Sequence, residues 1–461
     1  MTAGPAANAI LAAWTTTLAA RGGAPAVLDA RGGTLRTFAD IEAESGECAH
    51  LLEAIAQRAV VAVRIGNHPA WPALLLALFR RSLVPLPLGR HIEKAELDAA
   101  LATCGAAALV EAGPDGLRVL PRPRSHAVDA DFLKLTSGTT AAPRAIRFRA
   151  RHLLADCDHI CATMGLRADD VNFGAIPFSH SYGFSNLITP LLARGIALVA
   201  TEDRMPRAIL DGLARSGATV FPGMPVFFEK LADIANSPAL PRLRLCISAG
   251  ALLQAATAAR FAARFGLKIH AFYGSSECGG IAYDAGAEPC VEEGFVGAAM
   301  CGADIAPLAD GRIAVRGAAV GEGYHPEPDE AVLGGGRFIP GDLVECSPRG
   351  LRIVGRASDV INVAGRKLNP AEIEQRLLQC PGVRAAVVFG VPSRLRGEEP
   401  VACVAGAGID AGAVIEFCRA HLSLWQVPRD VWIVPEIAVS ERGKISRRVL
   451  AANYLAAHAR R

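Results

Sequence analysis

The chain has 461 residues, of which 51% are hydrophobic and 20% are charged, and its formal net charge is +3. This composition excludes a disordered chain, and the length predicts two or three domains rather than one. Six of the 48 basic residues are Lys and the rest are Arg. The sequence contains no long block of consecutive basic residues and no long segment in which aromatic and basic residues alternate. Nucleic acid is therefore not predicted as a partner.

Membrane insertion and export are not predicted either. The apolar run WPALLLALF, residues 71–79, is followed by two Arg and falls far short of the roughly 20 residues that cross a bilayer. We expect it to be a buried helix. The N-terminus lacks the basic start and clean apolar core of a secretory signal, so a cytoplasmic location is expected. The twelve Cys form no CxxC pair and no Cys/His cluster with zinc spacing, which favours buried thiols in a reducing compartment.

Strand and helix signals alternate from about residue 25 to residue 345. Short apolar runs such as VVAVRI, ALVA and RLCIS each precede an Ala/Leu-rich stretch with helical spacing. This alternation predicts an α/β fold, with a large N-terminal domain of helix-covered, mainly parallel sheets.

The last hundred residues change character. Short strand-like segments (RIAVRG, LVECSPRGLRIVGR, VRAAVVFG) mix with the helix-like AEIEQRLLQ and AVIEFCRAHL, which predicts a small α+β domain. The Gly-flanked polar segment GRASDVINVAGRK suits a hinge, so the small domain is expected to be mobile. We therefore predict a domain boundary between residues 356 and 357. This gives a large N-terminal domain of residues 1–356 and a small C-terminal domain of residues 357–461.

The segment LKLTSGTTAAPRAIRF, residues 133–148, suggests an anion-binding loop. Gly138 permits backbone angles that a Cβ would forbid, and its neighbours supply hydroxyl and N–H donors: Thr136, Ser137, Thr139 and Thr140. Such a loop suits a phosphate, although a plain polar turn has the same composition. The P-loop signature is excluded, because no Gly-Lys-Ser/Thr follows Gly138 at the required spacing.

Four further segments carry residues suited to nucleotide chemistry. YGSSECGG places Glu277 in a turn where it could hold Mg²⁺ between phosphates, and PGDLVE places Asp342 where it could accept hydrogen bonds from ribose. GRASDVINVAGRK supplies Arg356 and Lys367, and SERGKISRR supplies Lys444. Each residue alone could be a solvated charge, but their order makes coincidence a poor explanation.

In this order the motifs closely resemble those of the adenylate-forming, AMP-binding enzymes, which include acyl-CoA synthetases, aryl-CoA ligases, luciferases and the adenylation domains of peptide synthetases. The resemblance runs from GGTLRTFADIEAES near residue 32 to GKISRR at residue 448. TSGTT-x-x-P-R corresponds to the family's phosphate loop, ISAGALL to its adenine-contacting turn and YGSSE to its Mg²⁺ motif. GDL corresponds to the ribose motif, GRASDVINVAGRKLNPAEIE to the hinge and S-x-R-G-K-I-x-R to the catalytic-lysine motif.

The resemblance implies a first half-reaction in which a carboxylate attacks the α-phosphorus of ATP, giving an acyl-adenylate and pyrophosphate. Lys444 would bridge the carboxylate and the α-phosphate, and Glu277 would hold Mg²⁺. The implied ATP- and AMP-binding residues are the loop Thr136, Ser137, Gly138, Thr139 and Thr140 with Arg144, then Gly250, Ala251, Tyr273, Gly274, Ser276, Asp342, Arg356 and Lys367. Tyr273 would stack on adenine, although a buried aromatic is the alternative.

The second half-reaction implied by the resemblance transfers the acyl group to a thiol. The small domain would rotate about the hinge at Ser358 and bring Ala364 and Gly365 toward the pantetheine arm. PFSHSYG matches the acyl-site motif, with His180 as a catalytic gate between acyl group and thiol. The thiol would belong to coenzyme A or, as the alternative, to an acyl carrier protein. We expect a monomer or homodimer.

The chain departs from the family pattern at several positions. Ala141 and Ala145 replace Gly in the phosphate loop, Ser358 replaces the usual hinge Asp or Lys, and Ser393 replaces an Asp. None of these changes removes a charge that adenylation requires, so activity is expected and a non-catalytic nucleotide-binding protein is the weaker alternative.

The acid itself is only broadly predicted. The resemblance implies that amino-acid-activating members present an Asp at the segment that corresponds to 178–181. No acidic residue stands there to pair with an α-ammonium group, which favours a simple carboxylic acid. Residues 180–185 and 221–228 are aromatic and apolar, and Gly183 and Gly223 could leave space for an aryl or medium-length acyl group.

Overall fold

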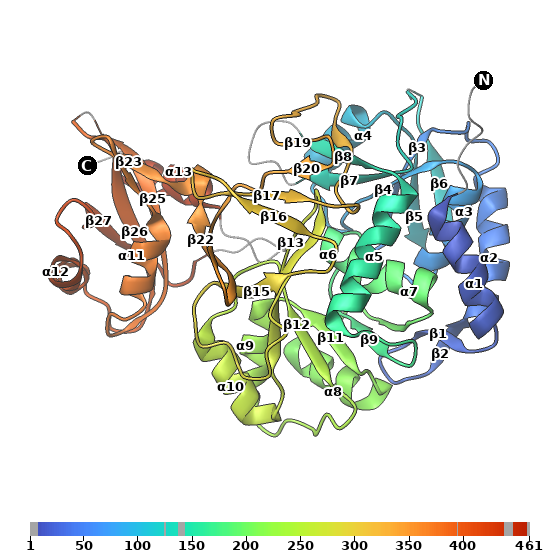
Figure 1. The fold of residues 1–461 in the computed structure, drawn as a ribbon, viewed down its shortest axis with the longest axis horizontal. Helices are drawn as coiled ribbons and strands as arrows, with labels where there is room; N and C mark the ends of the chain where they lie inside the picture. The colour runs from blue at the N-terminus through green and yellow to red at the C-terminus, as the bar shows by residue number, and fades with distance from the viewer. Residues whose placement is uncertain (1–7, 124–125, 137–142, 394, 438–445, 459–461) are drawn as a thin grey trace. The chain divides into compact units, whose positions relative to one another are not determined.

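A computed structural model describes residues 8–123, 126–136, 143–393, 395–437 and 446–458 (Figure 1). The chain divides into two compact units. The N-terminal unit comprises Met1–Ala306, Ala314–Pro340 and Pro348–Leu351, and the C-terminal unit comprises Pro307–Ile313, Gly341–Ser347 and Arg352–Arg461. The boundary between 356 and 357 stays a prediction, and each unit is described by itself.

The main sheet of the N-terminal unit has the strand order β2-β1-β10-β9-β11-β12-β13-β14-β15. From β1 to β13 each neighbouring pair in this order is parallel, whereas β2, β14 and β15 pair antiparallel. The parallel strands β9 to β12 are buried almost throughout, as expected where helices cover both faces. The bounds are β1 (Pro25–Leu28), β2 (Thr34–Thr37), β9 (Val171–Gly174), β10 (Ala197–Ala200), β11 (Val220–Gly223), β12 (Leu245–Ser248), β13 (Ile269–Ser275), β14 (Gly279–Tyr283) and β15 (Phe295–Ala299).

Two further sheets of the N-terminal unit contain strands β3 to β8. One has the order β4-β3-β5-β6 and the other the order β18-β8-β7. The bounds are β3 (Val60–Arg64), β4 (Val84–Pro87), β5 (Ala106–Gly113), β6 (Gly116–Pro121), β7 (Phe132–Thr136), β8 (Arg144–Phe148) and β18 (Gly323–His325). The short strands β16 (Asp304–Pro307), β17 (Ile313–Arg316), β19 (Leu333–Gly334) and β20 (Arg337–Phe338) form another sheet, in the order β16-β17-β20-β19.

The helices of this unit pack on these sheets (Figure 1). They are α1 (Ala9–Arg21), α2 (Phe38–Leu51), α3 (Trp71–Arg80), α4 (Lys94–Thr103), α5 (Ala150–Met164), α6 (Ser181–Gly183), a π-helical turn (Phe184–Ile188), α7 (Thr189–Arg194), α8 (Pro206–Ser216), α9 (Pro225–Asp233) and α10 (Ala255–Phe265). Residues 71–79 of α3 are all buried, which confirms the predicted core helix. In the part of the chain that the structure describes, no helix has the length and apolarity needed to span a membrane.

Local sequence explains where these helices begin and end. Thr37 and Asp40 form a capping box at the start of α2, and α8 and α9 begin with Pro, whose fixed φ suits the first helical position. Helices α5, α8 and α10 each end at a Gly in the left-handed conformation. The helices are therefore held between the strands by short, defined turns.

The C-terminal unit is a small α+β domain, as predicted. Its sheet has the order β24-β23-β26-β25, and β27 pairs parallel with β26. Strands β21 (Asp342–Ser347) and β22 (Gly350–Arg356) precede this sheet in the sequence. The sheet is formed by β23 (Ile361–Val363), β24 (Arg366–Leu368), β25 (Val383–Ser393), β26 (Gly397–Gly406) and β27 (Asp430–Ile433), and the helices are α11 (Pro370–Leu377), α12 (Ala411–His421) and α13 (Arg447–His458). Ile373, Leu377, Val388 and Val404 lie in the core that joins α11 to the sheet.

Candidate active site

The carboxyl ends of the parallel strands gather the candidate residues of the N-terminal unit. Strand β9 leads into PFSHSYG, β12 ends just before Gly250, and β13 ends just before Ser276. Because parallel strands point their carboxyl ends to the same edge, these three segments meet at one edge of the sheet. This is the edge where ligands bind in open α/β folds.

The predicted phosphate loop joins the antiparallel strands β7 and β8. At its base the hydroxyl of Thr136 donates a hydrogen bond of 3.0 Å to the carbonyl oxygen of Arg144, and the two residues are direct partners in the ladder. Ser137, Gly138, Thr139 and Thr140 lie outside the described residues. The two ends of the loop are thus fixed 3.0 Å apart by a hydrogen bond.

Glu277 is the centre of a polar cluster. Its Oε1 accepts a hydrogen bond of 3.1 Å from the phenol of Tyr324, and its Oε2 accepts one from the hydroxyl of Ser275. The guanidinium of Arg144 lies over the Tyr324 ring, 4.3 Å from its centroid. Burial first, and then the nearby Glu277 carboxylate, raise the pKa of Tyr324, so its phenol stays protonated and donates. The strand that leaves the phosphate loop is thereby linked to Glu277.

Ser276 joins the predicted acyl-site motif to the same cluster. The hydroxyl of Ser181 donates a hydrogen bond of 2.7 Å to that of Ser276. The neighbouring His180 accepts at Nδ1 from the backbone N–H of Tyr182, at 3.3 Å, and so caps the short helix α6. This bond leaves Nε2 as the position that carries the ring proton.

The residues predicted to contact adenine are divided between surface and core. Gly250 and Ala251 are exposed in the turn after β12, and Gly250 has φ +88°, a conformation that favours glycine. Gly274 is exposed as well, whereas Tyr273 is only 7% exposed. The alternative of a buried aromatic therefore describes Tyr273 better than an open stacking platform does.

The C-terminal unit brings the two predicted ribose residues together. Nε of Arg356 donates to Oδ1 of Asp342 at 3.0 Å, and the Asp342 side chain is 17% exposed. Ser358 and Lys367 are both exposed. The pair therefore presents a guanidinium beside a carboxylate, a combination that can bind neighbouring hydroxyl groups.

Ala364 and Gly365 form the tight turn between β23 and β24. Both have positive φ, 51° and 83°, and the N–H of Gly365 donates to Oδ1 of Asn362 at 3.0 Å. Two left-handed residues define the type I′ hairpin turn, in which Ala is strained and Gly is favoured. A Cβ on Gly365 would meet nothing within 4 Å, so the turn is open to an approaching ligand.

Lys444 lies outside the described residues, but the chain just after it is firmly held. The guanidinium of Arg447 pairs with the carboxylates of Asp359 and Glu374, at 2.8 and 3.0 Å for the two oxygens of Glu374. Its Nε also donates to the carbonyl of Val388 at 3.0 Å. Arg447 thus connects the start of α13 to the segment that follows the predicted hinge residue Ser358.

Sequence reasoning missed two residues of the site. Tyr324 lies 47 positions from Glu277, and only the β18–β8 pairing brings it near. Lys134 is 5% exposed, and its ammonium lies 4.7 Å from the Phe148 centroid. Burial lowers the pKa of Lys134, although Asp156 and Glu277 oppose this effect. The signal for Lys134 was available, because it is one of only six Lys, on the strand that enters the phosphate loop.

The structure corrects the expected acyl pocket. Phe221 and Phe228 are fully buried and pack on each other, with ring centroids 5.2 Å apart, so they belong to the core. Gly183 leaves no free space, because a Cβ there would lie 2.0 Å from the carbonyl oxygen of Pro177. Aromatic enrichment in a sequence does not distinguish a pocket wall from a core, and here the residues form the core.

Comparison with protein families now identifies the chain. The AMP-binding enzyme family matches residues 14–129 and 116–325, and the AMP-binding enzyme C-terminal domain matches residues 372–444. The chain belongs to the AMP-binding enzyme family. The predicted family and the α/β fold class with a small C-terminal domain are confirmed.

Individual relatives are similar along nearly the whole chain. Feruloyl-CoA synthase from Amycolatopsis sp is 28% identical over 457 residues, covering 90% of this chain and 93% of the relative. The crystal structure of ATP-bound MatB from Rhodopseudomonas palustris has a TM-score of 0.86 and 25% identity, covering 97% of this chain and 99% of that one. The amide bond synthetase McbA from Marinactinospora thermotolerans has a TM-score of 0.84 and 25% identity, covering 96% and 99%. The CoA ligases among the curated relatives support the predicted enzyme class, an AMP-forming acid–thiol ligase.

Proposed function

We propose that this protein activates a simple carboxylic acid with ATP, forming an acyl-adenylate and pyrophosphate, and then transfers the acyl group to coenzyme A. The observation that carries the proposal is the cluster of Arg144, Tyr324 and Glu277, which links the strand that leaves the phosphate loop to the predicted metal carboxylate. The similarity to CoA ligases supports the same reaction.

The first half-reaction brings two anions together, so the site must neutralise charge and align the attack. Arg144 and the donors of the loop at Thr136–Thr140 would bind the phosphates, and Lys444 would bridge the carboxylate and α-phosphate. The ribose would bind Asp342 and Arg356, while the turn at Gly250, Ala251 and Gly274 would face adenine. The acid's oxygen displaces pyrophosphate from the α-phosphorus, which gives the mixed anhydride.

The surroundings of Glu277 fit a magnesium ion. Each oxygen of its carboxylate accepts one hydrogen bond and keeps a further lone pair, and Mg²⁺ favours such oxygen ligands. No cluster of three or more His, Cys, Asp or Glu side chains suited to a metal occurs among the described residues, so phosphate oxygens and water would complete the shell. When bound, Mg²⁺ would stabilise the charge on the phosphates.

The second half-reaction needs a thiol near the acyl carbonyl. We infer that the C-terminal domain rotates about Ser358 and withdraws Lys444, and that the open turn at Ala364 and Gly365 then lies along the pantetheine arm. Lys367 would contact the nucleotide, and His180 would separate the acyl and thiol sites. The thiol attacks the carbonyl carbon, AMP leaves, and a thioester forms.

The test uses the purified full-length chain with Mg-ATP, a panel of benzoates, cinnamates and fatty acids, and either coenzyme A or a phosphopantetheinylated carrier protein. The proposal predicts AMP, pyrophosphate and an acyl-CoA with at least one acid. Loading of the carrier protein without acyl-CoA would favour the carrier-protein alternative. An acyl-adenylate that reacts only with an amine would contradict transfer to a thiol.

A further inference from the structure

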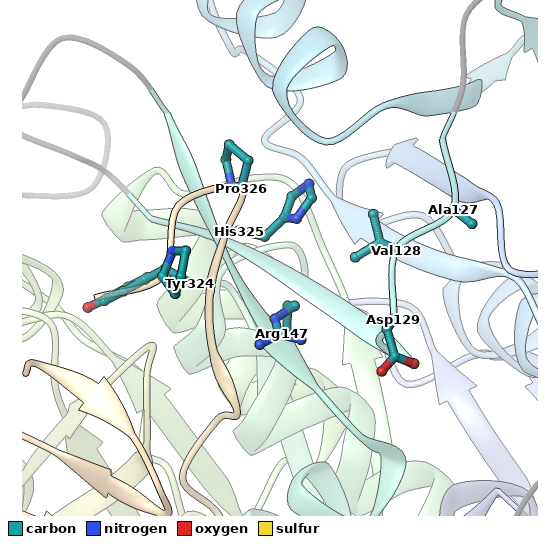
Figure 2. A pocket seen from close by; sticks show the side chains of 8 residues that line it. Ala127, Val128, Asp129, Arg147, Tyr324, His325 and Pro326 are labelled. Carbon is teal, nitrogen blue, oxygen red and sulfur yellow. The ribbon is translucent and has the colours of Figure 1, made fainter. Parts of the chain in front are cut away.

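A pocket of the N-terminal unit lies beside the β18–β8 pair (Figure 2). Its volume is ≈ 240 Å³. It is lined by Ala127, Val128 and Asp129, which precede β7, by Arg147 of β8, and by Tyr324, His325, Pro326 and Pro328 of β18 and the following loop. No candidate residue of the adenylation chemistry described above lines it except Tyr324.

The register of β18 against β8 explains why the pocket is open. His325 pairs with Ala145, and Gly323 pairs with Arg147. Directly opposed residues of an antiparallel pair lie on the same face, as do residues two apart along a strand, so the His325 and Arg147 side chains share one face. Their partners carry at most a methyl group, which leaves space. A Cβ on Gly323 would lie 3.3 Å from Nη2 of Arg147, so the guanidinium lies directly over this glycine.

The pocket is lined by one acidic and one basic side chain, Asp129 and Arg147, which do not pair with each other. The carboxylate of Asp129 instead pairs with Arg58 at 2.5 Å and with Arg149 at 2.8 Å. Across the described ranges, no carboxylate forms an ion pair or hydrogen bond with Arg147. A half-buried guanidinium without a counter-ion is costly, and an anion in the pocket would remove that cost.

The imidazole of His325 lines the pocket, and that of His126 lies beside it. Nε2 of His325 lies 3.5 Å from Nε2 of His126, and the ring centroids are 5.6 Å apart. Arg147 and the imidazole of His325 therefore give the pocket two groups that can bind oxyanions.

We propose that this pocket binds a terminal phosphate group through Arg147 and His325. A planar guanidinium binds phosphate through two parallel hydrogen bonds, and the volume exceeds what one phosphate needs, which leaves room for an organic group attached to it. Two sources carry this chemistry: free phosphate, and the 3′-phosphate of coenzyme A. The second source rests on the proposed function.

The first experiment titrates inorganic phosphate into the full-length protein by calorimetry, with the ATP site saturated by a non-hydrolysable ATP analogue and Mg²⁺. Arg147→Gln is expected to weaken binding at least about tenfold, as the loss of a charge-assisted hydrogen bond implies. Arg151→Gln is the matched control, because Arg151 is exposed, pairs with Glu322 and does not line the pocket. Equal affinity of wild type and Arg147→Gln for phosphate would show that free phosphate does not bind this pocket through Arg147.

The second experiment compares coenzyme A with dephospho-coenzyme A, which lacks the 3′-phosphate, as acyl acceptors. If the 3′-phosphate binds here, wild type prefers coenzyme A at least about tenfold in kcat/KM, and Arg147→Gln loses that preference while the Arg151→Gln control keeps it. An unchanged preference in Arg147→Gln, together with unchanged phosphate binding, would overturn the whole proposal. Absence of any thioester product would count against the proposed function alone, because the phosphate titration does not depend on turnover.

Discussion

The phenol of Tyr324 donates a 3.1 Å hydrogen bond to Oε1 of Glu277, the predicted magnesium ligand. Tyr324→Phe keeps the ring that supports Arg144 but removes this donor. Because a hydrogen bond to a charged group contributes about 1.5 to 3 kcal/mol, kcat/KM for Mg-ATP should fall about 10- to 100-fold. A magnesium titration of pyrophosphate release measures the change.

Tyr454→Phe is the control for this variant. It removes a 2.6 Å tyrosine–carboxylate hydrogen bond to Asp430 that involves no residue of the candidate site. Loss of stability with normal magnesium dependence is expected. If Tyr324→Phe behaved like this control, Tyr324 would have no role in positioning Glu277.

The pair of Arg356 and Asp342 should act on ATP binding. Arg356→Gln removes the charged partner from Asp342 and the group predicted to bind ribose, so KM for ATP should rise about tenfold with little change in thermal stability. Arg352→Gln is a close control, because Arg352 lies on the same strand and pairs with Glu345 at 2.6 Å. Equal effects of the two substitutions on KM would show that the Arg356 pair is only structural.

Arg447 should stabilise the C-terminal unit. It is 26% exposed and binds two carboxylates and a backbone carbonyl, so Arg447→Gln removes the Arg447 cation from Asp359 and Glu374. We expect a loss of about 1 to 3 kcal/mol in the free energy of unfolding, measured by urea denaturation. The exposed neighbour Arg448, changed to Gln, should lose almost nothing. A loss in Arg448→Gln as large as that in Arg447→Gln would contradict this account.

Asp170 should make stability fall in acid. The side chain is 1% exposed and accepts hydrogen bonds from Thr219 at 2.7 Å and from Arg244, each of which precedes a strand of the main sheet. Burial raises the pKa of Asp170, but the hydrogen bonds from Arg244 and its other partners outweigh burial and hold this pKa below its usual value.

The folded pKa of Asp170 thus lies below the unfolded one. Its contribution to stability is present above about pH 4 and is lost as pH falls through the folded pKa. Asp170→Asn should lower the free energy of unfolding by about 2 to 4 kcal/mol at neutral pH and flatten its decline in acid. If the free energy of unfolding of this variant fell in acid as steeply as that of wild type, other carboxyl groups would cause the decline.

Much of the fold and of the site could be predicted because it depends on the residue pattern within short, contiguous segments of the sequence. The alternation of buried strands and helices gave the α/β class, and Asp342 and Arg356 meet as their motifs suggested. The contact of Tyr324 with Glu277 could not be predicted, since it depends on strand pairing between distant segments. The expected space for an acyl group at Gly183 is wrong, because the carbonyl of Pro177 lies there and the sequence does not show this contact.

The proposed activation of an acid by ATP and its transfer to coenzyme A are tested most directly by identifying the reaction products. The reaction would contain ATP, coenzyme A and the acid that supports the highest rate of pyrophosphate release. Equal amounts of AMP, pyrophosphate and acyl-CoA are expected, with the rate reduced about 10²- to 10³-fold in Lys444→Ala and unchanged in Lys230→Ala, an exposed lysine. Formation of ADP and phosphate, or a Lys444→Ala variant as active as wild type, would contradict this proposal.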